Sequence, residues 1–293
     1  MVLPQFKVSG LILNIEYDDV AVSNRMDDYF TSSDQVPDLF IMVSSQDFIG
    51  FPNGKLLCDE QVKWVIKDPK ENGYYIFGQE ILQNRIITLL DVDAGWTSGK
   101  IQVLKNNDTN PIISYEFLSD YYLHHLIGMI FRYNLLRYNG IVVHASSLAW
   151  DGKGIMFSAP SGTGKSTHVK LWQEHIGDEV QVVNDDTPAV RFVNGKPILF
   201  GTPWSGNGTN CNMSVPLEAI VILEQADKNS IRRLSIPEAL GSLMPRCFIP
   251  YFDQGFMNLA MNVFEKIVLS VPVYMLACRP DKEAVEMVYQ WVR

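Results

Sequence analysis

The sequence predicts an α/β fold in two parts: a mixed β-sheet core around a phosphate-binding loop, preceded by a β-rich N-terminal domain. Three observations predict this organisation. Short β-rich runs separated by turns fill the first part of the chain, helical spacing of apolar residues begins after Ser119, and a glycine-rich loop follows a short apolar run further on. We expect the two domains to span residues 1–115 and 116–293.

The N-terminal domain is expected to consist mainly of strands. Side chains alternate along Phe6–Tyr17, with apolar residues from Leu11 to Tyr17 on one face, which indicates a single strand. Asn53-Gly54 and Asn72-Gly73 are dipeptides typical of hairpin turns. Further β-rich runs are Leu39–Val43, Tyr74–Phe77, Arg85–Leu90, Ile101–Leu104 and Ile112–Tyr115. No residue pattern typical of catalysis occurs in this domain, so the sequence assigns it no role.

The second domain alternates helices and strands. Apolar residues recur at three- and four-residue spacing between Leu123 and Leu135, which predicts a helix capped by Ser119 and ended near Gly140. The next predicted elements are the strand Ile141–Trp150, the turn 151–154, the strand Ile155–Ser158, a helix toward Glu174, the strand Val180–Val183, and a hairpin of Ala189–Val193 and Pro197–Phe200 around Asn194-Gly195. The last are the strand Ala219–Glu224, a helix after the Ser235–Glu238 capping box, a helical face over Phe256–Ile267, the strand Val273–Cys278 and an amphipathic helix after Pro280.

The most specific motif is Ala159–Thr167, which fits the P-loop pattern Gly-x-x-x-x-Gly-Lys-[Ser/Thr] except for alanine at its first position. Two glycines let the backbone turn so that its amides face phosphate oxygens at a helix N-terminus. The lysine can reach the β- and γ-phosphates, and the serine hydroxyl can bind Mg²⁺. The predicted nucleotide-binding residues are Ser161, Gly162, Thr163, Gly164, Lys165, Ser166 and Thr167. A chance glycine turn is the alternative, which the position between a strand and a helix disfavours.

A pair of carboxylates, Asp185 and Asp186, ends the apolar strand that follows the loop helix. Carboxylates beside a P-loop hold Mg²⁺, and one of two neighbours can also accept the proton of an attacking hydroxyl. The pair is therefore a candidate for both roles. The alternative is a solvated Asn-Asp-Asp turn.

One strand ahead of the loop lies His144, in Val143-His144-Ala145-Ser146. This histidine, the P-loop and the Asp185-Asp186 pair form a series that resembles the catalytic domain of HPr kinase/phosphorylase and the nucleotide half of ATP-dependent phosphoenolpyruvate carboxykinase. The resemblance covers about residues 117–225 and does not extend to residues 1–115. It implies a mixed-sheet P-loop kinase core that uses ATP and Mg²⁺.

The resemblance also implies roles for single residues. Asp185 would be the general base, Asp186 together with Ser166 would hold the metal, and His144 would lie beside the γ-phosphate or the metal. Because neighbouring residues at a strand end point to opposite sides, the roles of the two aspartates could be exchanged. Lys165 would act on the transferring phosphate.

The second HPr kinase signature is not reproduced. Gly201–Gly208 stands at the comparable place and resembles a segment of HPr-kinase-like proteins, some of which phosphorylate modified peptides. Gly206 in this segment and Arg246 further on are candidate contacts for the acceptor or a phosphate. A glycine-rich surface loop is the alternative for the segment, and a solvated surface charge for the arginine.

We therefore expect an ATP- and Mg²⁺-dependent kinase that phosphorylates a hydroxyl group of a peptide, a protein or a small molecule. The alternatives are a non-catalytic nucleotide sensor and, with less support, a carboxykinase-like lyase. The net charge of −9 disfavours nucleic acid or an anionic membrane as partner, and no apolar run approaches the length of a membrane span. Four scattered cysteines without a Cys-x-x-Cys pair, and no secretory signal, suggest a cytoplasmic protein. Assembly into a homo-oligomer stays open.

Overall fold

A computed structural model of the protein describes residues 4–17, 24–59, 62–80, 84–105, 115–205 and 211–293. The chain forms two compact units, Met1–Asn134 and Leu135–Arg293. The division falls in the last turn of helix α1 (Tyr115–Leu136), so most of this helix lies in the first unit. The boundary expected from the sequence, residue 115/116, lies instead where this helix begins.

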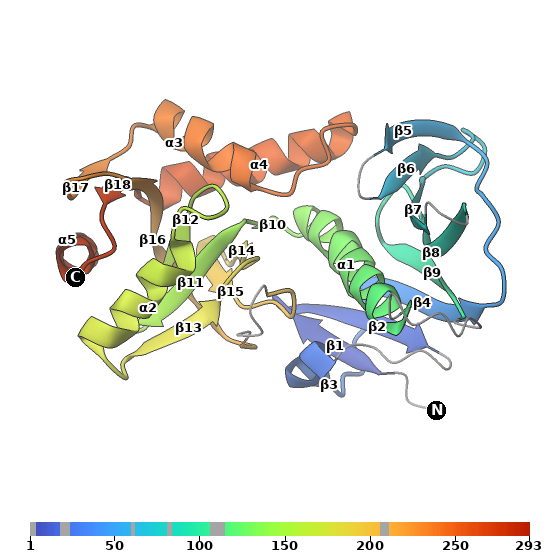
Figure 1. The fold of residues 1–293 in the computed structure, drawn as a ribbon, viewed down its shortest axis with the longest axis horizontal. Coiled ribbons are helices and arrows are strands. Elements are labelled where there is room, and N and C mark those ends of the chain that lie inside the picture. The colour runs from blue at the N-terminus through green and yellow to red at the C-terminus, as the bar shows by residue number, and fades with distance from the viewer. Residues whose placement is uncertain (1–3, 18–23, 60–61, 81–83, 106–114, 206–210) are drawn as a thin grey trace. The chain divides into compact units, whose positions relative to one another are not determined.

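The first unit contains a nine-stranded sheet in the order β3-β1-β2-β4-β9-β8-β7-β6-β5 (Figure 1). Its strands are β1 (Gln5–Val8), β2 (Leu11–Tyr17), β3 (Phe30–Thr31), β4 (Leu39–Gln46), β5 (Lys55–Asp59), β6 (Lys63–Ile66), β7 (Tyr74–Glu80), β8 (Arg85–Val92) and β9 (Ser98–Leu104), and a 3-10 helix, η1 (Asn24–Tyr29), precedes β3. Strands β2, β4 and β9 are parallel, and the other pairs are antiparallel.

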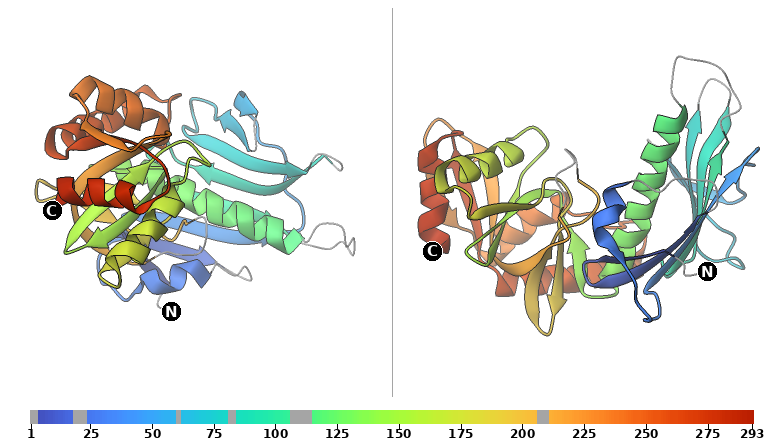
Figure 2. Two further views of the ribbon diagram at one scale, coloured as in Figure 1. Left: turned by 60° about the vertical axis from the view of Figure 1, so that its left-hand side comes forward. Right: turned by 90° about the horizontal axis from the view of Figure 1, so that it is seen from below.

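Helix α1 lies along the concave side of this sheet (Figure 2). Trp96 is fully buried beneath it, with the ring of Tyr133 at 4.6 Å and that of Tyr74 at 5.7 Å. Asn134 Nδ2 donates a hydrogen bond of 2.9 Å to the Trp96 carbonyl. The helix is thus fixed to the first sheet by aromatic packing and by a buried amide.

Several predictions for the first unit are wrong in detail. Phe6–Tyr17 is a hairpin rather than one strand, because Ser9 and Gly10 have φ values of 50° and 77° and turn the chain between β1 and β2. Asn53-Gly54 precedes β5 but joins it to no strand among residues 47–52. In the run Ile112–Tyr115, residues 112–114 lie outside the described residues and Tyr115 begins α1.

The second unit contains a mixed sheet in the order β10-β14-β15-β16-β12-β11-β13, with β18 paired to β16 and β17 to β18. Its strands are β10 (Gly140–Val142), β11 (Ala145–Trp150), β12 (Lys153–Ser158), β13 (Val180–Asn184), β14 (Ala189–Val193), β15 (Lys196–Phe200), β16 (Ser214–Gln225), β17 (Ser230–Arg233) and β18 (Val273–Cys278). Its helices are α2 (Lys165–Ile176), α3 (Ile236–Leu243), the 3-10 helix η2 (Met244–Arg246), α4 (Gln254–Ser270) and α5 (Lys282–Val292). The predicted fold class, an α/β part preceded by a β-rich part, is confirmed.

Three parallel strands, β12, β16 and β18, form the centre that positions the P-loop. Helices α2 and α5 cover this part of the sheet, where Trp172 and Val288 pack with Phe157 and Val221 in one buried cluster. The carboxyl ends of the three strands lie at one edge, which is where open α/β sheets bind their ligands.

Two helix and strand boundaries in the second half differ from prediction. Helix α1 begins at Tyr115, so Ser119 is not its cap, and it ends at Leu136 rather than near Gly140. The predicted strand Ile141–Trp150 is two strands, because β10 pairs with β14 whereas β11 pairs with β12 and β13. Among the helices in the described parts of the chain, none combines the length and the apolar character that crossing a membrane requires.

Candidate functional site

The P-loop connects β12 to α2 at the edge of the second sheet. Gly162 and Gly164 have φ values of 77° and 111°, and a Cβ added to either would meet no atom within 4 Å. Backbone conformation, not crowding, therefore requires glycine at both positions. Ala159, which replaces the usual first glycine, is fully buried and belongs to the cluster under α2, so the core accommodates its methyl group.

Lys165, the first residue of α2, is only 8% exposed, and its Nζ donates a hydrogen bond of 3.2 Å to the Ala159 carbonyl. Burial lowers the pKa of Lys165, and Arg246 lowers it further, whereas Asp186 and Asp185 raise it. The ammonium group is thus held inside the loop within the electrostatic influence of both aspartates.

A hydroxyl that the sequence did not single out connects the loop to the first aspartate. Ser146 Oγ donates a hydrogen bond of 2.7 Å to Asp185 Oδ1 and lies 3.5 Å from Ser166 Oγ. Ser146 is fully buried on β11, two residues after His144. The Asp185 carboxylate therefore lies on the side of the proposed metal ligand Ser166.

The second aspartate is close to the histidine instead. His144 Nε2 lies 3.5 Å from Asp186 Oδ1. His144 is not in a strand but at the break between β10 and β11, where its N–H donates to the Arg246 carbonyl at 2.7 Å and the Ala145 N–H donates to the Asp186 carbonyl at 2.9 Å. The pKa of His144 is lowered by burial, by Lys165 and by Arg246, against the opposing effect of Asp186, so its imidazole is neutral at pH 7.

Asn184, also missed by the sequence analysis, fixes the turn that presents the two aspartates. It is fully buried, and its Oδ1 accepts hydrogen bonds from the N–H groups of Asp186 and Thr187 at 2.9 and 2.7 Å. Its Nδ2 donates to the Thr202 carbonyl at 2.9 Å. The Asn-Asp-Asp segment is therefore a hydrogen-bonded turn with a buried anchor.

The first residues of Gly201–Gly208 support this turn from below. Thr202 and Ser205 are buried, which does not fit the surface-loop alternative for this part of the segment. A Cβ on Gly201 would lie 1.8 Å from the Cys211 carbonyl oxygen, so this close approach of two backbones requires glycine. Gly206, a predicted acceptor contact, lies outside the described residues.

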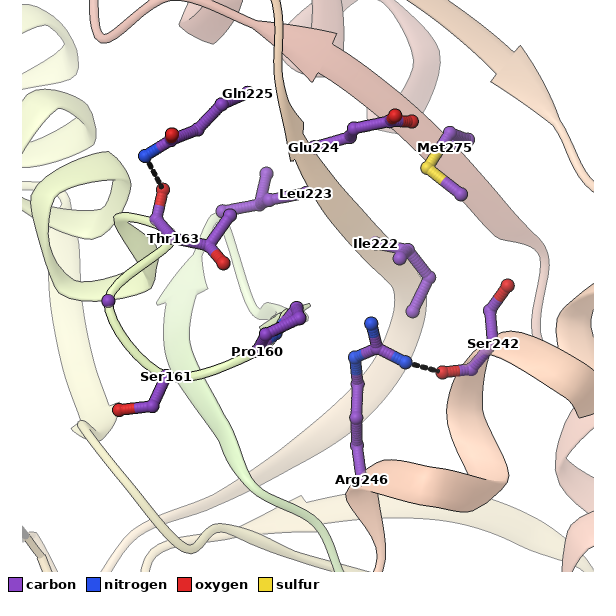
Figure 3. Close-up of a pocket in the computed structure, with 11 residues that line it drawn as sticks. Pro160, Ser161, Thr163, Ile222, Leu223, Glu224, Gln225, Ser242, Arg246 and Met275 are labelled. Carbon is purple, nitrogen blue, oxygen red and sulfur yellow. Dashed lines mark hydrogen bonds between the residues drawn. The ribbon is translucent and has the colours of Figure 1, made fainter.

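A first cavity, of about 460 Å³, lies between the P-loop and Arg246. Figure 3 shows the Arg246 side chain, from η2, pointing into it between Pro160 and Ser242. Arg246 Nη1 donates to the Ser242 carbonyl, while its Nε is buried and has no hydrogen-bond partner among the described residues. Burial also lowers the pKa of the guanidinium. A buried donor without a partner at the edge of a cavity is suited to an anionic group of a ligand.

A second cavity, of about 580 Å³, lies on the other side of the loop. Its walls include Thr167 and His168 from α2 and the ends of β16 and β18. Gln225 Nε2 donates to the Thr163 carbonyl at 3.3 Å, and both residues line both cavities. The two cavities therefore flank one loop, each along a different part of it.

The residues at the loop suit Mg²⁺ in their chemistry. The hydroxyl of Ser166 and the carboxylates of Asp185 and Asp186 offer oxygen atoms, which Mg²⁺ prefers. Within the described ranges there is no cluster of three or more His, Cys, Asp or Glu residues arranged to hold a metal ion. A cation here would thus take few ligands from the protein and the rest from phosphate and water, as Mg²⁺ commonly does.

Comparison with known proteins places this geometry in a family. The solved structure of the HPr(Ser) kinase/phosphatase from Coxiella burnetii matches with 15% sequence identity and a TM-score of 0.30, over 52% of this chain and 93% of that chain. No curated protein matches the chain. The family model described as SynChlorMet cassette protein ScmC matches residues 121–281, which is more than half of the chain. The chain therefore belongs to the ScmC family of SynChlorMet cassette proteins.

Proposed function

We propose that the second unit is an ATP- and Mg²⁺-dependent kinase that transfers the γ-phosphate to a hydroxyl group of a peptide, a protein or a small molecule. The observation that carries the proposal is the convergence of two carboxylates on the P-loop, one bonded through Ser146 toward Ser166 and the other beside His144. A loop that bound phosphate for structure alone would need neither carboxylate.

The bonding pattern supports an exchange of the two roles that the resemblance implied. Asp185 shares Ser146 with Ser166, so these two residues would hold Mg²⁺, which when bound neutralises charge on the phosphates of ATP. Asp186 lies beside a neutral His144 and is more exposed, with 42% of its side chain accessible. It is therefore the better candidate for the general base.

In the proposed reaction the acceptor oxygen forms a bond to the γ-phosphorus, and the bond between this phosphorus and the β–γ bridging oxygen breaks. The hydroxyl proton moves to Asp186, and ADP leaves. Lys165 holds the phosphates, since its ammonium group is already fixed over the loop by Ala159. Arg246 Nε would donate to a phosphate or to an anionic group of the acceptor from the first cavity.

The test is transfer of label from [γ-³²P]ATP, with Mg²⁺, to fractionated proteins, peptides and metabolites of a lysate. The kinase proposal predicts a labelled phosphoester in at least one fraction, formed with the wild type and lost with Lys165→Ala. Binding of one ATP per chain without transfer to any acceptor would instead support the nucleotide sensor. Transfer that survives Lys165→Ala would place the activity at another site.

A further inference from the structure

The second cavity has no part in the proposed phosphoryl transfer, yet it touches the P-loop. It meets the loop from Gly162 to Thr167, whereas the first cavity meets Pro160 to Thr163 and contains Arg246. The transferring phosphate belongs at the first cavity, beside Arg246 and Ser161. A triphosphate laid along the loop would therefore have its other end, and whatever that end carries, at the second cavity.

One side chain in this cavity has a fixed hydrogen-bonding state. His168 is only 3% exposed, and its Nε2 accepts a hydrogen bond of 3.3 Å from Trp172 Nε1. An indole N–H can only donate, so Nε2 carries no proton and the proton of the ring lies on Nδ1. The ring of Phe157, whose centroid lies 4.7 Å from that of His168, packs beside it.

This Nδ1–H group is free to bind a ligand. It forms no hydrogen bond to any described residue, and it is not among the buried atoms that lack a partner, so it keeps accessible surface. His168 lines the second cavity, which is where that surface lies. The structure thus directs one oriented donor into the cavity.

The remaining walls suit a neutral group better than another phosphate. Arg279 is paired with Asp281 at 3.0 Å and with Glu283 at 3.6 Å, so its charge is already compensated. Leu223 contributes an apolar surface, and burial raises the pKa of the Cys278 thiol to about 11, which keeps it uncharged. Ring nitrogens, carbonyl oxygens and ribose oxygens of a nucleoside are acceptors that match a single N–H donor.

We propose that the second cavity holds the nucleoside of the bound triphosphate and that His168 Nδ1–H donates to an acceptor atom of its base or ribose. This inference rests on the proposed function, because it takes a nucleoside triphosphate as the ligand of the loop. It makes His168 a residue that determines affinity for the nucleoside and not for the phosphates.

The test compares binding of ATP, GTP and inorganic tripolyphosphate, each with Mg²⁺, by titration calorimetry. The wild type should bind ATP or GTP at least about tenfold more tightly than tripolyphosphate, and His168→Phe should remove about tenfold of nucleotide affinity while tripolyphosphate binding is unchanged. Phenylalanine keeps the packing on Phe157 but has no donor. Equal binding of nucleotide and tripolyphosphate by the wild type, or a parallel loss of both in the variant, would overturn the inference.

Because His168→Phe also leaves the Trp172 N–H without its acceptor, a second variant tests the same cavity from its rim. Ala226 is half-buried at the end of β16, and Ala226→Phe should fill the cavity and weaken nucleotide binding at least about tenfold, again without affecting tripolyphosphate. Ala277→Phe, a half-buried alanine on β18 that lines neither cavity, is the matched control and should bind both ligands normally. Normal nucleotide binding by Ala226→Phe would contradict the inference.

The two proposals fail in different ways. Nucleotide binding with this pattern but without phosphoryl transfer would refute the kinase and leave the nucleoside cavity supported. Absence of binding by the wild type to all three ligands would refute the nucleotide site, and the inference with it.

Discussion

Both units of the chain contain large sheets with three neighbouring parallel strands, but they use their buried polar groups differently. In the second unit the buried residues Ser146, Asn184 and Thr202 are linked by hydrogen bonds to the Asp-Asp turn and to one another's neighbours. In the first unit buried Asn134 holds Trp96, and the buried Thr88 hydroxyl has no partner among the described residues. Buried polarity in the first unit thus serves packing, whereas in the second it positions carboxylates.

The chain segments that follow the parallel strands explain this difference. Strand β12 continues into a turn with two left-handed glycines and then into α2, so backbone N–H groups gather at one point. Strand β4 of the first unit continues into residues 47–53, which contain neither helix nor strand. The comparison teaches that a parallel sheet makes a phosphate site only where its strand ends lead into a glycine turn and a helix N-terminus.

The largest expected effect contrasts a buried lysine from each unit. Lys165→Ala should lower phosphoryl transfer about a hundredfold or more, because no other ammonium group is held over the loop by the Ala159 carbonyl. Lys67, whose side chain is also 8% exposed and which pairs with Asp91, is the matched control in the first unit. Lys67→Ala should lower the melting temperature but keep the rate within about twofold. Equal rate losses in both variants would remove the functional distinction between the units.

The next effect concerns acid stability, to which each unit contributes one buried histidine. Burial lowers the pKa of His124 in the first unit and of His168 in the second from 6.5 to about 4. Each histidine binds a proton more readily in the unfolded chain, so its stabilising contribution is complete above pH 6.5 and is lost as the pH falls toward 4. At pH 5 we expect a loss of about 2 kcal/mol for each histidine, measured by denaturant unfolding.

His124→Phe and His168→Phe should each remove their own share of this pH dependence. The wild type and either variant should therefore converge in stability as the pH is lowered. Parallel curves for the wild type and a variant would show that the histidine in question is not held neutral by burial.

The smallest effect contrasts two buried hydroxyls. Ser146→Ala should reduce the Mg²⁺-dependent gain in ATP affinity about fivefold to tenfold, since Asp185 loses the donor that orients it toward Ser166. Thr88→Val in the first unit removes a hydroxyl without a partner, so it should leave ATP binding unchanged and keep or slightly raise stability. A calorimetric titration with and without Mg²⁺ measures the first effect, and thermal unfolding measures the second. Unchanged Mg²⁺ dependence in Ser146→Ala would separate Asp185 from the metal.

Local signals were sufficient to predict much of the second unit. The capping box at Ser235 begins α3, Asn194-Gly195 joins β14 to β15, and Val273–Cys278 is β18 over its full length. In each case the deciding interaction lies within a few residues of the signal. The P-loop belongs to this group as well, because its glycines lie between an apolar strand and the helix that follows.

The errors arose where distant contacts decide the structure. The apolar pattern continues through Ser9-Gly10, so the turn between β1 and β2 is not visible in it. The break at Val143-His144 exists because β10 and β11 pair with different partners. Ser146 and Asn184 gained their roles from residues 39 and 18 positions away in the chain, which no local pattern contains.

The most direct test of the kinase assignment is the single-turnover rate of phosphoryl transfer in Asp186→Asn and Asp185→Asn, measured beside the Mg²⁺ dependence of ATP binding. Asp186→Asn should bind Mg·ATP within a few-fold of the wild type but transfer phosphate at least about a hundredfold more slowly, whereas Asp185→Asn should mainly weaken the Mg²⁺-dependent binding. Asp151→Asn, the same change in the left-handed turn between β11 and β12, should match the wild type in both measurements. Unchanged phosphoryl transfer in both Asp185→Asn and Asp186→Asn would contradict the assignment and reduce the pair to a structural turn.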